Sequence, residues 1–153
     1  MRRCGVLMPV SGLWSPYGIG SFSKEAYEFV DFLEQAGQSL WQILPLGPTG
    51  YGDSPYQSFS TFAGNPYYID LKALTQKGWI TEKECEDCDF GDCQDFIRYD
   101  KIYKQRFKLL RKAYENSGIS EDEDFNRFCE KNAYWLEDYA LYMAVKKSYS
   151  GIS

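Results

Sequence analysis

Short apolar runs and one amphipathic segment alternate at the start of the chain. Residues 4–10 and 40–44 are apolar runs of strand length, and residues 24–36 between them place apolar side chains at helical spacing. That helical face comprises Ala26, Phe29, Val30 and Leu33. Gly37 follows as the expected helix-ending residue. The pattern predicts a strand–helix–strand unit with parallel strands and a right-handed crossover. Because both runs are apolar throughout, we expect strands buried on both faces.

After residue 70 the pattern becomes helical. Residues 71–77 predict a short helix, and Thr81 with Glu84 predicts a capping box for another. Residues 100–115 predict a longer helix whose apolar stripe comprises Tyr103, Phe107, Leu110 and Tyr114. A two-stranded parallel sheet is not stable by itself, so we expect further strands beyond Ser153 and a truncated chain.

Two more helices are expected near the end of the chain. Ser120 and Glu123 predict a second capping box, ahead of a helix that contains Phe125 and Phe128. A separate last helix is marked by Trp135, Tyr139 and Tyr142.

The loop at residues 45–58 is the stretch around which the chain is organised. It holds three Gly and three Pro in fourteen residues, which favours a defined backbone shape over a floppy one. It follows the second predicted strand, and loops at the carboxyl ends of parallel strands carry the sites of α/β proteins. Tyr51 and Tyr56 offer flat, amphipathic rings that suit a sugar, although both could instead pack onto the rim of the sheet.

Composition narrows the ligand class. The net charge is −5, from 17 basic and 22 acidic residues, and no basic stripe suited to nucleic acid or to a polyanionic membrane surface is present. The 13 Tyr outnumber the 10 Phe, which leans toward carbohydrate binding. The chain has no histidine, which excludes Ser-His and Cys-His catalysis and His-ligated zinc within it. A neutral ligand fits this composition best.

A phosphate-binding site and a zinc site are weaker interpretations. Residues 47–54 come close to a P-loop, but Asp53 stands where the phosphate-binding Lys is needed and Pro48 has no N–H to donate. Cys85, Cys88 and Cys93 could ligate zinc in principle, but their spacing matches no common site, so we interpret them as incidental thiols.

Catalytic carboxylates are harder to find. Asp31, Asp53 and Asp70 are those nearest the loop-rich end of the predicted sheet, and they form no convincing glycosidase pair.

The chain is predicted to be cytosolic. Its five cysteines accompany no secretory signal, because Pro9 and Ser11 interrupt the apolar run after the basic start. No span reaches the roughly 20 apolar residues that a membrane helix needs.

Several segments carry a resemblance to a known family. They are Arg3–Pro9, Tyr17–Gly20, Trp41–Gly50, Gly52–Ser58, Phe62–Pro66 and Trp135–Tyr142. Over almost its whole length the chain resembles the N-terminal part of amylomaltase, the 4-α-glucanotransferase of glycoside hydrolase family 77.

The resemblance implies a fold and a chemistry. The family fold is a (β/α)8 TIM barrel with inserted helical subdomains, so residues 1–70 would be the start of the barrel and 71–153 an inserted helical subdomain. The family transfers α-1,4-glucan segments between maltooligosaccharides by a retaining double displacement, with no metal or organic cofactor. No protein partner is implied.

The resemblance also implies roles for single residues. The family's catalytic Asp, Glu and second Asp lie on later barrel strands, so no catalytic residue is expected in this chain and the fragment alone should be inactive. Asp53, Ser54 and Tyr56 belong to a motif that lines the donor-side pocket, with Ser54 and Tyr56 touching glucose. Tyr51 matches a position of a second glucan-binding surface.

Two alternative functions remain open from the residues. The first is a stand-alone α-glucan-binding module that uses Tyr51 and Tyr56 without catalysis. The second is a nucleotide-binding domain, which Asp53 disfavours.

Overall fold

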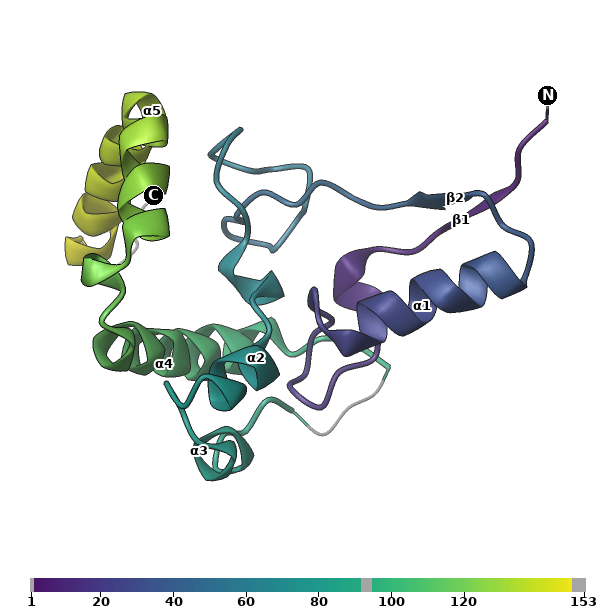
Figure 1. The fold of residues 1–153 in the computed structure, drawn as a ribbon, viewed down its shortest axis with the longest axis horizontal. Coiled ribbons are helices and arrows are strands. Elements are labelled where there is room, and N and C mark those ends of the chain that lie inside the picture. The colour runs from purple at the N-terminus through teal and green to yellow at the C-terminus, as the bar shows by residue number, and fades with distance from the viewer. Residues whose placement is uncertain (1, 92–94, 150–153) are drawn as a thin grey trace. The chain divides into compact units, whose positions relative to one another are not determined.

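The computed structural model describes residues 2–91 and 95–149, and the chain divides into two compact units (Figure 1). Residues 1–116 form the first unit and residues 117–153 the second. Each unit is described by itself below.

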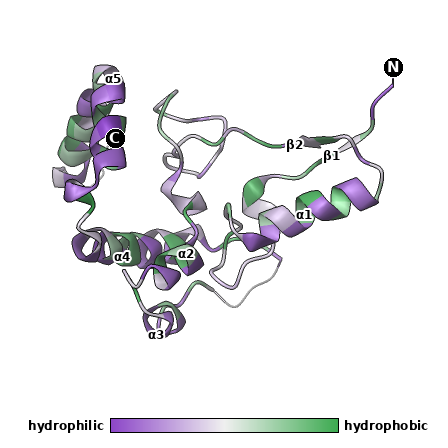
Figure 2. Ribbon diagram, in the orientation of Figure 1, coloured by the Kyte–Doolittle hydropathy of each residue, from purple (hydrophilic) through white to green (hydrophobic). Residues whose placement is uncertain are grey.

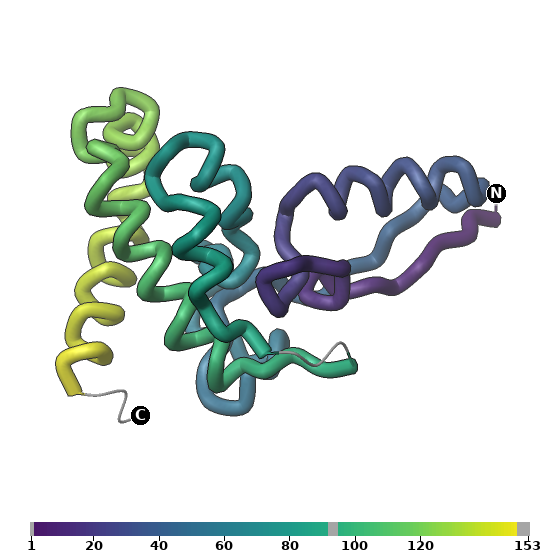
Figure 3. Tube along the Cα trace, turned by 90° about the horizontal axis from the view of Figure 1, so that it is seen from below, coloured from purple at the N-terminus to yellow at the C-terminus, as the bar shows by residue number. Residues whose placement is uncertain are grey.

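The predicted strand–helix–strand unit is confirmed. Strands β1 (Gly5–Leu7) and β2 (Leu40–Gln42) pair in parallel, with Val6 opposite Trp41. Helix α1 (Lys24–Gln35) connects them and lies alongside both strands (Figure 3). Gly37 ends the helix region with a φ of 69°, a left-handed angle that glycine adopts without strain.

The expectation that both strands are buried is wrong for the described residues. Leu7 is 56% exposed and Leu40 is 49% exposed. Among the described residues β2 pairs only with β1, and α1 provides the cover. Figure 2 shows α1 alternating hydrophobic and hydrophilic residues, as expected of a helix with one covered face. The apolar composition of the strands therefore exceeds what the described residues bury.

A small apolar cluster joins α1 to the strands. Its buried members are Val10, Leu13 and Ala26, of which the first belongs to a 3₁₀ turn, η1 (Val10–Gly12). Trp41 packs edge-on against Phe29 at 5.1 Å between ring centroids and donates its indole N–H to the Met8 carbonyl at 2.8 Å. These contacts fix the start of the loop that follows β2.

The larger core lies among the helices that follow. It is built around the 3₁₀ turn η2 (Pro66–Tyr68), α2 (Leu71–Gln76), α3 (Glu82–Glu86) and α4 (Tyr99–Ser117). Its buried members are Ile19, Tyr67, Leu71, Ile80, Cys85, Phe90, Ile102, Leu109 and Ala113.

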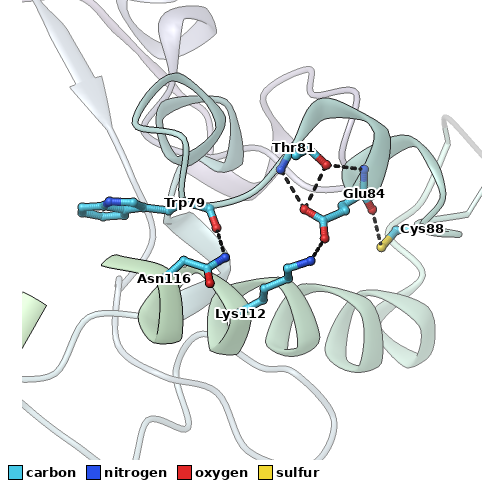
Figure 4. A network of polar contacts seen from close by, with 6 residues as sticks. All are labelled: Trp79, Thr81, Glu84, Cys88, Lys112 and Asn116. Atoms are coloured by element: carbon cyan, nitrogen blue, oxygen red, sulfur yellow. Dashed lines mark hydrogen bonds and ion pairs between the residues drawn. The ribbon is translucent and has the colours of Figure 1, made fainter. Parts of the chain in front are cut away.

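A polar network fastens α3 to α4 (Figure 4). The predicted capping box of Thr81 and Glu84 is confirmed, with the Thr81 N–H donating to Glu84 at 2.8 Å. The other oxygen of the Glu84 carboxylate pairs with Lys112 of α4. Asn116, one turn further along α4, donates to the Trp79 carbonyl at 2.8 Å. The Glu84 carboxylate thus caps the N-terminus of α3 and also links α3 to α4 through Lys112.

The predicted apolar stripe of α4 is wrong except at Leu110, which packs against the larger core. The residues that α4 buries are Ile102, Arg106, Leu109 and Ala113. Tyr103, Phe107 and Tyr114 of the predicted stripe are exposed. Arg106 is 1% exposed and donates to the Ile69 carbonyl at 2.5 Å, while its Nε and Nη1 have no partner within the described part of the chain. Because Arg106 is charged, the sequence pattern did not indicate that the face of α4 that contains it is the buried one.

The second unit contains one long helix. A 3₁₀ turn, η3 (Ile119–Glu121), precedes α5 (Glu123–Ser148). The predicted capping box at Ser120 is wrong, because Asp122 is the N-cap and accepts from the Phe125 N–H at 2.8 Å. The two helices expected here are one continuous helix. Within the described ranges, no helix combines the length and the apolar character needed to cross a bilayer.

Candidate functional site

The loop after β2 folds back on itself. An antiparallel bridge joins Thr49 to Ser58, and the Asn65 N–H donates to the Leu46 carbonyl at 2.8 Å. Gly47 faces Ser58 so closely that a Cβ at this position would overlap the Ser58 side chain. The loop therefore takes its defined shape from internal hydrogen bonds and from Gly47. Any other residue at position 47 would force the Ser58 side chain or the backbone to move.

The second half of the loop is held by serine and asparagine side chains. The Ser58 hydroxyl donates to the Ser60 carbonyl at 2.8 Å, and the Ser60 Oγ accepts from the Ala63 N–H at 3.0 Å. Asn65 caps η2 by accepting from the Tyr67 N–H at 3.0 Å. Local side-chain bonds of this kind stabilise turns in place of strand pairing.

Asp53 has an unusual backbone angle within the loop. Its φ is 51°, and among the described residues it is the only non-glycine with a positive φ. Its Oδ1 accepts from the Thr49 hydroxyl at 3.2 Å, and its N–H donates to the Gly50 carbonyl at 3.2 Å. Asp tolerates the left-handed region better than most residues. Asp53 therefore shapes the turn that presents the residues after it.

The Asp53 carboxylate affects the pKa of Tyr67, which lies just after the loop. Burial raises the pKa of the Asp53 carboxyl, and the bond from Thr49 partly opposes that rise. Burial, and then the Asp53 charge, raise the pKa of the Tyr67 hydroxyl well above its ordinary value. Tyr67 packs against Tyr99 and Phe107 of α4, at 5.9 and 6.0 Å between ring centroids. The loop is thereby anchored on the helical core.

An open groove of about 600 Å³ runs along the loop. Tyr56 lines it and is 73% exposed, and the Phe62 ring lines it too. Small residues, including Gly47, Ser58 and Ser60, complete its wall with backbone and hydroxyl groups. Aromatic faces beside polar edges match the apolar face and polar rim of a sugar ring.

The predicted site residues fall into two sets. Tyr56 lies in the groove, whereas the Tyr51 ring is fully exposed and is not part of the groove wall. Asp53 and Ser54 are half-buried and do not line the groove, and the Ser54 carbonyl accepts from the Gln57 N–H at 3.1 Å. Of the two predicted tyrosines, Tyr56 therefore lines the groove and Tyr51 does not.

Phe62 lines the groove, although it is not among the predicted site residues. The sequence marks it only as part of the segment Phe62–Pro66 that carries the family resemblance. Phe62 follows the bridge between Thr49 and Ser58 and lines the same groove as Tyr56, and no local sequence pattern encodes that pairing.

The three carboxylates considered for catalysis have other settings. Asp31 is exposed on α1, Asp70 caps α2 by accepting from the Lys72 N–H at 2.9 Å, and Asp53 bonds to Thr49. These are the settings of a solvated, a helix-capping and a turn-forming carboxylate. We assign no catalytic pair within the described residues.

The thiols give no metal site in the part that the structure describes. No group of three His, Cys, Asp or Glu there is arranged to hold a metal ion. Burial raises the pKa of the Cys85 thiol to about 11, so it is protonated at neutral pH. Cys88 donates its S–H to the Glu84 carbonyl at 3.2 Å. Cys93 lies outside the described residues.

Comparison with known proteins gives a consistent result. The family model described as 4-alpha-glucanotransferase matches residues 8–153. The 4-alpha-glucanotransferase of Clostridium butyricum is 53% identical over 95% of this chain and 30% of its own length. That of Thermus thermophilus is 46% identical over 99% of this chain and 30% of its own length.

A solved structure agrees with these relatives. The amylomaltase from Streptococcus agalactiae in complex with acarbose superimposes with a TM-score of 0.87 at 38% identity, over 98% of this chain and 31% of that one. The chain thus spans about 30% of the length of the curated relatives it matches.

Proposed function

This chain belongs to the 4-alpha-glucanotransferase family, and on that premise we propose that it is the N-terminal part of an enzyme that transfers α-1,4-glucan segments between maltooligosaccharides. The transfer proceeds by a retaining double displacement through a covalent glucosyl-enzyme intermediate. The observation that carries the proposal is the groove lined by Tyr56 and Phe62, on a loop that the match to the family includes.

The β1–α1–β2 unit is proposed as the first part of a (β/α)8 barrel. The exposed apolar side chains of Leu7 and Leu40 support this, since further strands and helices would cover them. Residues 1–70 then belong to the barrel, and residues 71–153 form the inserted helical subdomain. The first compact unit spans that boundary, because α2 to α4 share a core with Ile19 and Tyr67.

Substrate contact is the part of the reaction that this chain provides. Ser54 and Tyr56 touch the glucosyl units on the donor side, and Asp53 sets the turn that presents them. Tyr51 contributes a separate glucan-binding surface. The catalytic carboxylates are assigned to later barrel strands, so none is placed among the described residues. The proposed substrates are maltooligosaccharides and other α-1,4-glucans, which are neutral and match a loop whose one charged side chain is Asp53.

The experiment is a kinetic comparison of Tyr56→Ala and Tyr56→Phe in the product of the complete open reading frame. Loss of the ring should lower kcat/KM for maltotriose disproportionation about ten- to hundredfold, as expected for an aromatic contact worth ~1.5–3 kcal/mol. The Phe variant keeps the ring and should retain most of the activity. Unchanged rates in Tyr56→Ala would remove the assigned role.

A stand-alone α-glucan-binding module is the second candidate. It is favoured by the same exposed rings, which need no catalytic partner to hold a sugar. It predicts that this 153-residue chain shifts its tryptophan emission with maltoheptaose. No response at millimolar sugar would remove it.

A further inference from the structure

The groove beside Tyr56 is built by one stretch of chain. Every residue that lines it lies between positions 45 and 64, and none of the helices α1 to α4 contributes to the wall that the structure describes. The stretch is closed at its base, where the Asn65 N–H donates to the Leu46 carbonyl at 2.8 Å. The position of the groove wall therefore depends on what holds β2 before the stretch and the residues just after Asn65.

The residues just after Asn65 are attached to α4. The Tyr67 ring packs on aromatic side chains of that helix. Arg106 of α4 donates through its Nη2 to the Ile69 carbonyl at 2.5 Å. Ile69 is the C-cap of η2, and Asn65 is the N-cap of the same turn. Arg106 is thus bonded to one end of a single turn whose other end closes the loop.

The burial of Arg106 costs free energy. The residue is 1% exposed, and with the residues that the structure describes it makes no ion pair. Burial lowers the pKa of its guanidinium to about 10, so the group is still charged at neutral pH. A buried charge without an ionic partner is unfavourable, and an apolar side chain of similar volume in its place is often neutral or stabilising. The stability of the helical core therefore does not account for an arginine at this position.

The other buried residues of α4 differ from Arg106 in what they can do. Ile102, Leu109 and Ala113 lie on the same face and are members of the larger core. Their side chains are apolar and can only fill space. A guanidinium on a long side chain can reach a backbone carbonyl and fix its position through a charge-assisted hydrogen bond, which is shorter and stronger than a neutral one. The contribution that Arg106 adds to this face is therefore its bond to Ile69.

We propose that Arg106 is a positioning residue for the groove, because its bond to the Ile69 carbonyl sets the turn that closes the loop and thereby the place of the aromatic rings that line the groove. Arg106 itself touches no substrate, since it is buried and does not line the groove. The inference rests on the proposed function, because it assigns a further residue to the substrate-binding site of that function. It predicts that an apolar side chain at position 106 weakens substrate binding without lowering the stability of the fold.

The test compares Arg106→Met with Arg106→Lys in the product of the complete open reading frame. Met fills a similar volume without the charge, so the urea midpoint should be unchanged or higher. The KM for maltotriose should rise about tenfold, as expected from losing one charge-assisted hydrogen bond, with kcat unchanged because the groove contacts serve ground state and transition state alike. Lys keeps a charged donor on a long side chain and should return KM most of the way to the wild-type value.

Ile102→Val is the matched control, since Ile102 is fully buried on the same face of α4. It should lower the urea midpoint, because it leaves a small cavity, and it should leave KM unchanged. An unchanged KM in Arg106→Met would overturn the inference. A raised KM that Lys does not restore would also overturn it, as would a urea midpoint of Arg106→Met below that of Ile102→Val, because Arg106 would then act through stability.

A second measurement does not depend on activity. The same proteins are labelled with 3-fluorotyrosine for ¹⁹F NMR, and Tyr56→Phe assigns the Tyr56 signal. That signal should shift in Arg106→Met and stay in place in Arg106→Lys and Ile102→Val. A wild type that performs no maltotriose disproportionation would remove the proposed function, and the Tyr56 signal would still decide the role of Arg106. An active enzyme in which Arg106→Met changes neither KM nor the Tyr56 signal would overturn the role of Arg106 alone.

Discussion

The strand region and the helical region of the first unit bury their apolar residues to different degrees. Leu71 at the start of α2 and Ile102 in α4 are 0% exposed, whereas Leu40 of β2 is half-exposed. Both regions are rich in apolar residues, so the difference lies in what covers them. The helical region closes its own core, and the strand region leaves apolar side chains such as Leu40 exposed. The site loop connects the two and takes its shape from its own hydrogen bonds.

The largest effect is expected from truncating a buried side chain in the core of the helical region. Leu71→Ala should lower the free energy of unfolding by about 2–5 kcal/mol, because it leaves a cavity in a closed core. Urea denaturation followed by circular dichroism measures the loss. A cost below about 1 kcal/mol, the range of surface substitutions, would contradict the closed core.

The matching change in the strand region should depend on chain length. In the 153-residue chain, Leu40→Ala should cost less than about 1 kcal/mol, because half of that side chain already faces solvent. In the product of the complete open reading frame the cost should rise to ~2 kcal/mol or more if barrel strands cover Leu40. The same urea measurement on both proteins checks this. An equal, small cost in both would contradict the proposed barrel.

A smaller effect is expected from the capping box. Thr81→Ala should cost about 1 kcal/mol, because it removes the hydroxyl that accepts from the Glu84 N–H and donates to the Glu84 carboxylate. Thr81→Ser keeps the hydroxyl and serves as the control in the same thermal melts. Identical melting temperatures for the Ala and Ser variants would show that the box adds nothing.

The smallest effect concerns Asp53 and pH. Its carboxyl has a raised pKa in the folded chain, so its contribution to stability is complete below its ordinary value of 3.8 and is lost as pH rises through the folded pKa. Asp53→Asn keeps a side chain that tolerates the positive φ and removes this titration. The stability of the wild type relative to Asp53→Asn should therefore fall as pH rises from 3.5 to 6 (about the range of a carboxyl with a raised pKa). Urea midpoints across that range measure the difference, and a wild type that gains relative stability with pH would contradict the sign.

Periodicity predicted the elements whose environment lies within the described residues. The α1 helix, the parallel strands and the Thr81–Glu84 box depend on local spacing and capping chemistry, and all three are confirmed. Burial of the strands could not be judged in the same way, because it depends on which elements pack against them and not on local spacing. The sequence pattern recorded the apolar character of Leu7 and Leu40 but not what covers them.

The buried face of α4 and the groove needed three-dimensional information. Arg106 lies on the buried face of α4. Charged residues are usually exposed, so the sequence pattern predicted a different face of the helix as the buried one. In the site loop, composition predicted a shaped loop with exposed tyrosines, and Tyr56 is indeed exposed at the groove. Phe62 lines the groove after the chain has paired Thr49 with Ser58, and no propensity predicts that pairing.

The most direct test of the proposed transfer function is to incubate the product of the complete open reading frame with maltotriose and to analyse the sugars by chromatography. The account predicts glucose together with maltooligosaccharides longer than maltotriose, formed without added metal or cofactor. Maltotriose that stays unchanged, or that yields only glucose and maltose by hydrolysis, would contradict it.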